Sequence, residues 1–403
     1  MRTRIRRLPL LFAVATALAM MLSTVSGPPP ADAATPILPA PDPDPFYSAP
    51  PDLAAHHNGD ILRVRQVDVG RYGPANGWQI LFRSSNSQGA PIAAMTTLMV
   101  PLMPAAHRPL MSYQAMINSL GLECAPSHEL LRGTVQEAPA LTAMLLRGWA
   151  VAVPDHLGPE SEYGAARLGG QIVLDGIRAA EALPQAGLGG SPIGLAGYSG
   201  GAMATAWADA LAPTYAPDLR IAGVAAGGIP ANMIDMARGL GVAPHPLFGL
   251  GFAAAIGLER AYPQQVPLSS QLNPQGVALR NEMANMCTQQ IIDVGANKDA
   301  QQLSTTTDPL MSPSARAVLA ENSLEYYPGA PTAPTFVWQG GADVLVPVGA
   351  VDRTVAHWCR AGDRVDYARL PGLDHGPAGV IGLPQAIAYM EGRFDGAAPP
   401  SNC

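Results

Sequence analysis

The chain has 403 residues and a formal net charge of −7, with 23 arginines and a single lysine, Lys298. Hydrophobic residues make up 48% of the chain and charged residues only 14%, a composition that excludes an intrinsically disordered protein. No basic stripe is present, so we expect no nucleic-acid partner. A length near 400 residues is typical of one large domain with an insertion, or of two domains.

The N-terminal segment, residues 1–33, has the pattern of a signal peptide. Four arginines within residues 2–7 precede an apolar run at 8–22, and Ala31-Asp32-Ala33 forms a small-x-small cleavage site. The alternative is a membrane anchor, but the run is short for a membrane span and prolines follow it. We therefore expect a secreted, extracellular protein whose mature charge is −10.

Apolar patterning predicts an α/β protein. Residues 34–60 read as a proline-rich N-terminal arm, and strands are expected at 61–69, 78–83 and 93–100. From about residue 109, short apolar strands alternate with helix-length segments. The expected strands are 110–113, 149–153, 192–196, 221–226, 335–338 and 364–370, and the expected helices are 138–147, 171–183, 202–211, 350–360 and 379–394. Two of these helices are expected to stop at prolines, Pro184 and Pro213. Such alternation indicates a mostly parallel sheet covered on both faces.

One long segment, residues 229–330, interrupts this alternation. It contains helix-like stretches without a clear strand series, so we expect a helical cap, or lid, inserted into a core formed by 61–228 and 331–403. The segment is rich in methionine. The simpler interpretation of these methionines is ordinary core filling, and the alternative is an adaptable wall for an apolar substrate. They are Met233, Met236, Met283, Met286 and Met311.

The strongest local signal is the G-x-S-x-G motif Gly197-Tyr198-Ser199-Gly200-Gly201. It lies between an expected strand and an expected Ala-rich helix, as a nucleophilic serine on a sharp strand-to-helix turn requires. The flanking glycines allow close approach of the two backbones, and the N–H of Gly200 would point at a developing oxyanion. The alternative is a Gly-Ser loop that only connects two elements.

A serine hydroxyl needs a base, and His375 is the best candidate among the eight histidines. It lies in Pro371-Gly372-Leu373-Asp374-His375-Gly376, which we expect to be a loop between the last strand and the last helix. Other histidines lie near the arm, in the insertion, inside a helix or before the serine in chain order.

The third catalytic residue should be an acid that orients the imidazole, and Asp343 fits this role best. It follows the expected strand 335–338, at the edge where open parallel sheets bind ligands. The order Ser199, Asp343, His375 is the order of an α/β-hydrolase. The competing acids are Asp352, Asp363, Asp366 and Asp374.

Several further motifs occur in a characteristic order. They are Asp44-Pro45-Phe46-Tyr47, Cys124-Ala125-Pro126-Ser127, Pro154-Asp155-His156 with Gly158-Pro159, Gly227-Gly228-Ile229-Pro230 and Gln339-Gly340-Gly341-Ala342-Asp343. Together with the serine motif, they make the chain resemble the secretory lipases, a family of the α/β-hydrolase superfamily that includes the fungal lipase A type. The resemblance implies an α/β-hydrolase fold with an inserted helical cap and a Ser-Asp-His triad.

The four cysteines, in an exported protein, predict two disulfides with three pairings open. The resemblance implies the pairs Cys124–Cys287 and Cys359–Cys403. It also implies a second oxyanion donor, a main-chain N–H in the segment Ile117-Asn118-Ser119, which we assign to Asn118.

The function expected from these features is a secreted serine ester hydrolase, a lipase or carboxylesterase. It would cleave acyl esters such as acylglycerols through an acyl-enzyme on Ser199 and make transient contact with lipid interfaces. This chemistry needs no metal and no organic cofactor. Two alternatives use the same fold: an acyltransferase with the same triad, and a catalytically inactive lipid-binding protein.

Overall fold

The computed structural model describes residues 35–306 and 312–403, so the expected signal peptide and Met311 lie outside the described residues. Nine strands form one sheet in the order β1-β2-β3-β5-β4-β6-β7-β8-β9. The strands are β1 (Ile61–Val67), β2 (Ala75–Ser85), β3 (Pro91–Pro101), β4 (Leu110–Gln114), β5 (Ala150–Pro154), β6 (Ile193–Tyr198), β7 (Ile221–Gly227), β8 (Thr335–Gly340) and β9 (Val365–Leu370).

The sheet is antiparallel at one end and parallel over the rest. The pairs β1–β2, β2–β3 and β3–β5 are antiparallel, whereas every neighbouring pair from β5 to β9 is parallel. The parallel strands β4, β5 and β8 are buried along their whole length. Their largely apolar sequences follow from this two-sided burial. A mostly parallel sheet is therefore confirmed.

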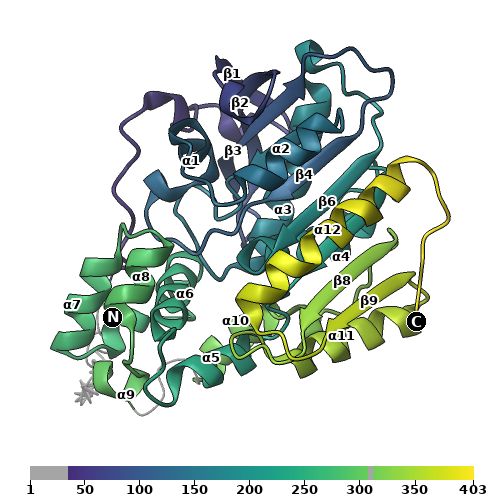
Figure 1. Ribbon diagram of the computed structural model, residues 1–403. Helices are drawn as coiled ribbons and strands as arrows, with labels where there is room; N and C mark the ends of the chain where they lie inside the picture. The colour runs from purple at the N-terminus through teal and green to yellow at the C-terminus, as the bar shows by residue number, and fades with distance from the viewer. Residues whose placement is uncertain (1–34, 307–311) are drawn as a thin grey trace, which may run out of the picture. The chain divides into compact units, whose positions relative to one another are not determined.

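Helices cover both faces of the sheet (Figure 1). One face carries α2 (Ala138–Leu146) and α12 (His375–Phe394), which pack on a core that includes Met111 and Trp338. The other face carries α3 (Ala166–Ala182), α4 (Gly200–Tyr215) and α11 (Val348–Ala361), around a core that includes Trp207 and Trp358. The short helix α1 (Pro126–Arg132) precedes α2.

The chain between β7 and β8 forms a group of helices, drawn from teal to green in Figure 1. They are α5 (Met233–Gly241), α6 (Phe248–Ala261), α7 (Pro274–Met283), α8 (Thr288–Gly295), α9 (Ala300–Leu303) and α10 (Pro313–Glu321). Much of this segment has a hydrophobic core of its own, which includes Phe248, Phe252 and Ile291. Below, residues 229–330 are called the insertion.

Three helix boundaries differ from the sequence expectation by four or five residues. Helix α3 begins at Ala166 rather than at residue 171. Helix α4 continues past Pro213 to Tyr215, because a proline near the end of a helix removes only one main-chain donor and the buried residues before it hold the helix together. Helix α12 begins at His375 rather than at residue 379. Asp374 caps its first turn through a hydrogen bond from the His375 N–H, and the first turn of a helix tolerates Pro377.

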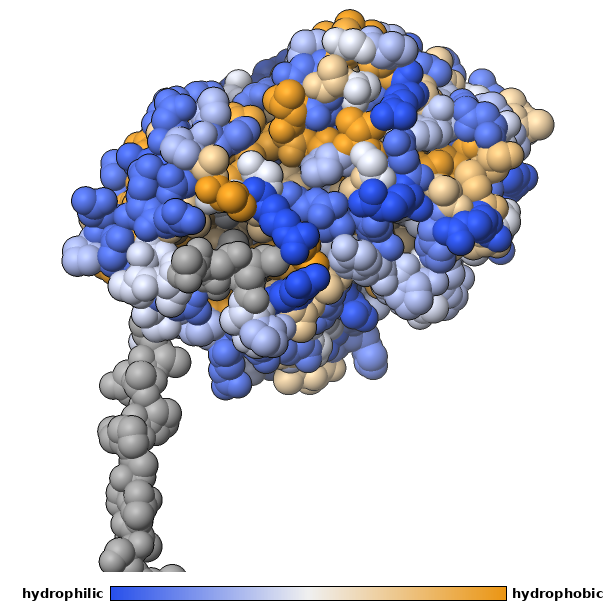
Figure 2. Space-filling view, turned by 90° about the horizontal axis from the view of Figure 1, so that it is seen from below, coloured by the Kyte–Doolittle hydropathy of each residue, from blue (hydrophilic) through white to orange (hydrophobic). Residues whose placement is uncertain are grey.

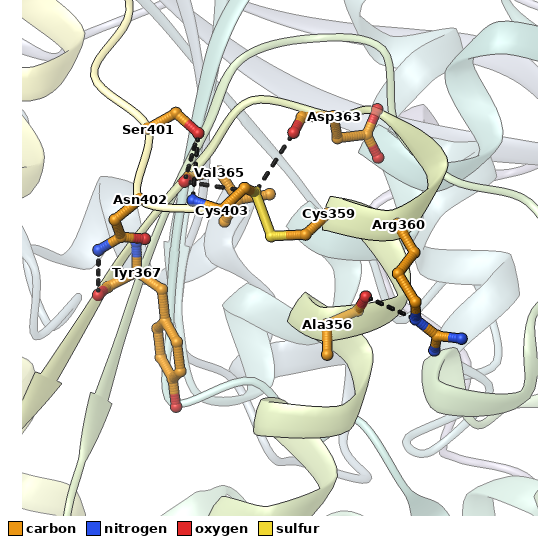
Figure 3. Close-up of a disulfide and its surroundings, with 9 residues drawn as sticks. All are labelled: Ala356, Cys359, Arg360, Asp363, Val365, Tyr367, Ser401, Asn402 and Cys403. Atoms are coloured by element: carbon orange, nitrogen blue, oxygen red, sulfur yellow. Dashed lines mark hydrogen bonds between the residues drawn. A yellow bond between two sulfur atoms is a disulfide. The ribbon is translucent and has the colours of Figure 1, made fainter.

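The structure forms two disulfides, Cys124–Cys287 and Cys359–Cys403, the pairs that the resemblance implies. The first joins the loop after β4 to the N-terminus of α8. The second ties the C-terminus to α11, beside the edge strand β9 (Figure 3). There the Asn402 N–H donates to the Val365 carbonyl at 3.0 Å, and the Asn402 side chain bonds to Tyr367. The C-terminal residues therefore cover part of an edge that would otherwise expose unpaired main-chain groups.

Three of the motifs named above converge in a network close to the N-terminal arm. The Tyr47 hydroxyl donates to Ser127 Oγ at 3.0 Å, and Ser127 Oγ donates to Asp155 Oδ2 at 2.6 Å. Burial raises the pKa of Asp155 to about 6, although its hydrogen bonds to Ser127 oppose this shift. These motif residues thus join the arm to the core.

Candidate active site

Ser199 lies on the turn between β6 and α4, with φ of 54° and ψ of −121°. This left-handed φ is unusual for a residue with a side chain and is typical of a functional turn. Close packing holds the turn in place: a Cβ atom at Gly201 would lie 2.1 Å from the Gln114 carbonyl oxygen. Only glycine fits there, so the helix can begin directly beneath the serine. The Ser199 side chain is presented at the carboxyl edge of the sheet.

His375 lies between Ser199 and Asp343. Its Nε2 is 2.8 Å from Ser199 Oγ, and its Nδ1 is 2.7 Å from Asp343 Oδ2. Ser199 follows β6, Asp343 follows β8, and His375 starts the helix that follows β9. The three residues selected from the sequence are therefore adjacent in space, in an arrangement that can pass a proton from the serine to the imidazole.

The Asp343 carboxylate is fully buried and accepts several hydrogen bonds. Its Oδ1 accepts from the N–H groups of Leu345 and Val346, at 3.0 and 2.8 Å. Its Oδ2 accepts from Gln339 Nε2 at 2.7 Å. Gln339 belongs to the motif Gln339-Gly340-Gly341-Ala342-Asp343, which by itself does not indicate this role. Its position four residues before the acid, at the end of the same strand, was the available signal.

The neighbouring acid, Asp374, acts on the backbone instead. Its Oδ1 accepts from the His375 N–H at 2.7 Å and from the Val344 N–H at 3.0 Å. These main-chain hydrogen bonds lower the pKa of Asp374. Asp374 therefore links the loop that carries Asp343 to the first turn of α12.

The Tyr198 ring packs against the His375 ring. Its ring centroid lies 5.1 Å from that of His375, and its hydroxyl donates to the His375 carbonyl. Burial, and to a lesser extent the charges of Asp343 and Asp374, raise the pKa of Tyr198. The tyrosine therefore remains a neutral hydrogen-bond donor at ordinary pH.

The sequence expectation names Gly200 and Asn118 as the donors to an oxyanion. The N–H of Gly200 belongs to the first turn of α4, where main-chain donors have no partner within the helix. The main-chain N–H of Asn118, in contrast, donates to Thr288 Oγ1 of the insertion at 3.1 Å. The Asn118 side chain lies over Gly200, since Oδ1 would be 2.3 Å from a Cβ placed there. The Asn118 side chain therefore lies beside the turn that carries Ser199, whereas its main-chain N–H is bonded to the insertion.

A narrow apolar cavity of about 50 Å³ adjoins the serine. Ser199, Gly200 and Asn118 line one part of it, and residues of α5 and α6 line another. Met233 and Met236 line this cavity, whereas Met283 is buried in the core of the insertion. Core filling therefore accounts for Met283, while the interpretation of Met233 and Met236 as an adaptable wall for a substrate stays a prediction.

Within 35–306 and 312–403, no group of three or more His, Cys, Asp or Glu residues has the geometry to hold a metal ion. None of the helices in these same ranges is both long and apolar enough to cross a membrane.

Comparison with known proteins identifies relatives of the chain. The model of the family described as "Secretory lipase" matches residues 130–402. Lipase A of Moesziomyces aphidis is 30% identical over 91% of this chain and 83% of its own length. A protein of Mycobacterium tuberculosis named "probable inactive lipase" is 32% identical, over 88% and 83%. The crystal structure of Candida antarctica lipase A in its closed state superposes with a TM-score of 0.86, at 29% identity, over 91% of this chain and 89% of that one.

Proposed function

Because the chain belongs to the secretory lipase family and is a serine ester hydrolase, we propose that Ser199, His375 and Asp343 form its catalytic triad. The observation that carries this proposal is the unbroken contact from Ser199 Oγ through His375 to Asp343, at 2.8 and 2.7 Å. One relative carries the name of an inactive lipase, but here all three groups are present and in contact.

In the proposed reaction, Ser199 Oγ attacks the ester carbonyl while His375 Nε2 accepts its proton. The His375 imidazolium then gives that proton to the alcohol oxygen as the bond from this oxygen to the carbonyl carbon breaks. The alcohol departs, and the acyl group remains bound to Ser199 Oγ. A water molecule, deprotonated by His375, then attacks the acyl carbon. The carboxylic acid is released, and the proton returns to Ser199 Oγ. Asp343 holds the imidazole through Nδ1 and stabilises its positive charge. Gln339 and the two main-chain N–H groups hold the Asp343 carboxylate in its orientation.

The developing oxyanion would be stabilised by the N–H of Gly200 and by the side-chain amide of Asn118. The Asn118 carboxamide lies against Gly200 and lines the same cavity as Ser199, and a half-turn about its last side-chain torsion exchanges Oδ1 for Nδ2 at that position. The main-chain N–H of Asn118 has Thr288 as its acceptor, which favours the side chain over the main chain as donor. Two converging donors are what oxyanion stabilisation requires.

The insertion, residues 229–330, would act as a cap that supplies the acyl-binding wall. The support is the cavity beside Ser199, whose lining includes Met233, Met236 and Leu258 of the insertion. Its lining is apolar, and methionine side chains adapt to varied shapes. Together with relatives named as lipases, this favours acyl esters such as acylglycerols as substrates.

We also propose that the protein is exported with loss of residues 1–33 and acts at lipid interfaces. Its family is secretory, it has two disulfides, and large apolar side chains are exposed near the triad. Val344, Val380 and Ile381 are exposed to 69%, 75% and 56%. Figure 2 shows apolar side chains gathered between hydrophilic ones on the face seen from below. Exposed apolar side chains near the triad suit contact with a lipid surface.

The test is labelling with a fluorophosphonate, which reacts with an activated serine. We expect peptide mass spectrometry of the full secreted protein to find the adduct on Ser199. Prior denaturation by heat should abolish the labelling, because the activation depends on the folded triad. Absence of an adduct in folded protein, or an adduct on another serine, would contradict the proposal.

A further inference from the structure

A second, larger apolar space lies between α2 and α12, on the face of the sheet that these two helices cover. It has a volume of about 460 Å³ and is called here the α2/α12 groove. Tyr198 and Trp338 are among its lining residues, and their rings stack with centroids 5.7 Å apart. Most other side chains that line it are apolar; they include Met111, Met116, Met144, Trp149, Leu383 and Ile387. Among the residues that the structure describes, none lines both this groove and the narrow cavity beside Ser199.

One part of the groove adjoins the triad. His375 and Gly376 line it there, together with Met116, which lies two residues before Asn118. The narrow cavity, in contrast, is lined by Ser199, Gly200 and Asn118. The two apolar spaces therefore adjoin the Ser199–His375 pair separately, one at the serine and the other at the histidine.

An ester has two substituents that diverge from its carbonyl carbon. In acyl transfer, the bond from Ser199 Oγ to that carbon forms, and the bond from the carbon to the alcohol oxygen breaks. The proton that left Ser199 passes from His375 Nε2 to the departing oxygen. That oxygen must therefore lie within hydrogen-bond reach of His375, and the carbon chain attached to it continues away from the histidine.

We propose that the α2/α12 groove binds the alcohol part of the ester, and that the protein accepts esters of large, apolar alcohols. This inference rests on the proposed function of the triad. It assigns the narrow cavity to the acyl group and the groove to the leaving group.

The sizes and the lining of the two spaces support this assignment. The groove, at about 460 Å³, greatly exceeds the cavity beside the serine, at about 50 Å³. Four methionines, Met111, Met116, Met144 and Met390, line the groove and can adapt to chains of different shape.

The acidic residue of the groove is also consistent with an apolar ligand. Glu137 Oε1 accepts a hydrogen bond from the Met116 N–H at 2.6 Å. Burial raises the pKa of Glu137, which favours its neutral form. The Glu137 carboxyl therefore holds the loop before Asn118 rather than offering a charge to a substrate.

The proposal is tested with two butyrate esters that differ only in the alcohol, ethyl butyrate and dodecyl butyrate, in the same detergent micelles. For the wild-type protein we expect kcat/KM to be at least about tenfold higher for the dodecyl ester, because each buried methylene favours binding several-fold. Ile387→Trp fills the groove and should lower this ratio about tenfold. Gln385→Trp, on the exposed side of the same helix, should leave the ratio unchanged.

Further measurements separate this proposal from the others. The ratio of kcat/KM for p-nitrophenyl octanoate to that for p-nitrophenyl acetate should be the same in wild type and in Ile387→Trp, because the acyl group lies in the narrow cavity beside Ser199. If Ile387→Trp does not fold, as judged by thermal melting, Leu383→Gln replaces it as a polar change in the groove. Equal rates for the two butyrate esters, or equal effects of the two Trp variants, would overturn the groove while Ser199 labelling still supports the triad.

Discussion

The Gln339 side-chain amide donates a hydrogen bond of 2.7 Å to Asp343 Oδ2, the same oxygen that contacts His375 Nδ1. Gln339, at the end of β8, therefore contacts the Asp343 carboxylate on one side, and the His375 imidazole contacts it on the other side. Hydrogen bonds to a carboxylate are stronger than those between neutral groups, so this contact helps to fix the orientation of Asp343.

Gln339→Leu should therefore lower kcat by about 10- to 100-fold, as expected for the loss of one hydrogen bond to a charged group. KM should change little, because Gln339 does not line the acyl cavity. Steady-state kinetics on p-nitrophenyl butyrate measure both values. Gln79→Leu is a matched control: Gln79 is also buried, but it donates to the Ser127 carbonyl near the arm. Equal kcat values for Gln339→Leu and Gln79→Leu would show that Gln339 has no special role.

Replacing Asn118 distinguishes its two donors. Asn118→Ala removes the side-chain amide but keeps the main-chain N–H that contacts Thr288. If the side chain binds the oxyanion, kcat should fall by about 10²- to 10³-fold with a smaller change in KM. A variant with nearly wild-type kcat would indicate that the main-chain N–H of Asn118, and not its side chain, is the donor to the oxyanion. Thr288→Val serves as the companion variant, because it removes only the acceptor of the main-chain N–H.

The insertion should set the acyl-chain preference. Met236→Trp places a larger side chain at the cavity beside Ser199 and should lower kcat/KM for p-nitrophenyl decanoate at least about tenfold relative to the acetate. Arg238→Trp, at an exposed position of the same helix, should leave this ratio unaltered. The prediction is wrong if the two variants have the same profile over a series of p-nitrophenyl esters.

Stability should depend on pH through Glu162, a buried acid next to Glu160 and Arg260. Burial, and then the charge of Glu160, raise the pKa of Glu162 from 4.5 to about 8. Between these two values the folded protein holds a proton that the unfolded chain has released. Folding stability from this group is therefore fully present below pH 4.5 and is lost as the pH rises towards 8.

Glu162→Gln removes this dependence. Compared with the variant, the wild type should lose up to about 1.4 kcal/mol of unfolding free energy for each pH unit between roughly 5 and 8. Urea unfolding of both proteins at pH 5 and pH 8 measures the difference. A parallel pH dependence of the two proteins would mean that Glu162 titrates normally.

The sequence predicted the sheet well because its signals are local. Buried parallel strands such as 335–338 form continuous apolar runs, and the glycines around Ser199 mark a turn where a Cβ atom would clash with Gln114. The start of α12 was missed because Gly376 and Pro377 suggest a loop. The capping carboxylate of Asp374 and the tolerance of a first helical turn for proline decide otherwise.

Contacts between distant segments could not be derived from local pattern. The hydrogen bond from Asn118 to Thr288 joins positions 170 residues apart, and nothing in either segment indicates it. The α2/α12 groove likewise depends on the spacing of two helices that are far apart in the chain. The methionines divide for the same reason, since only the packing of α5 brings Met233 and Met236 next to the serine.

The central claim, that Ser199 is the nucleophile of an ester hydrolase, is tested most directly by the kcat/KM of Ser199→Ala on p-nitrophenyl butyrate. The variant should fold like the wild type, because alanine fits the turn and removes only the hydroxyl. We predict a loss of about 10⁴-fold or more relative to wild type. A folded Ser199→Ala protein that keeps more than about one tenth of the wild-type kcat/KM would contradict the assignment.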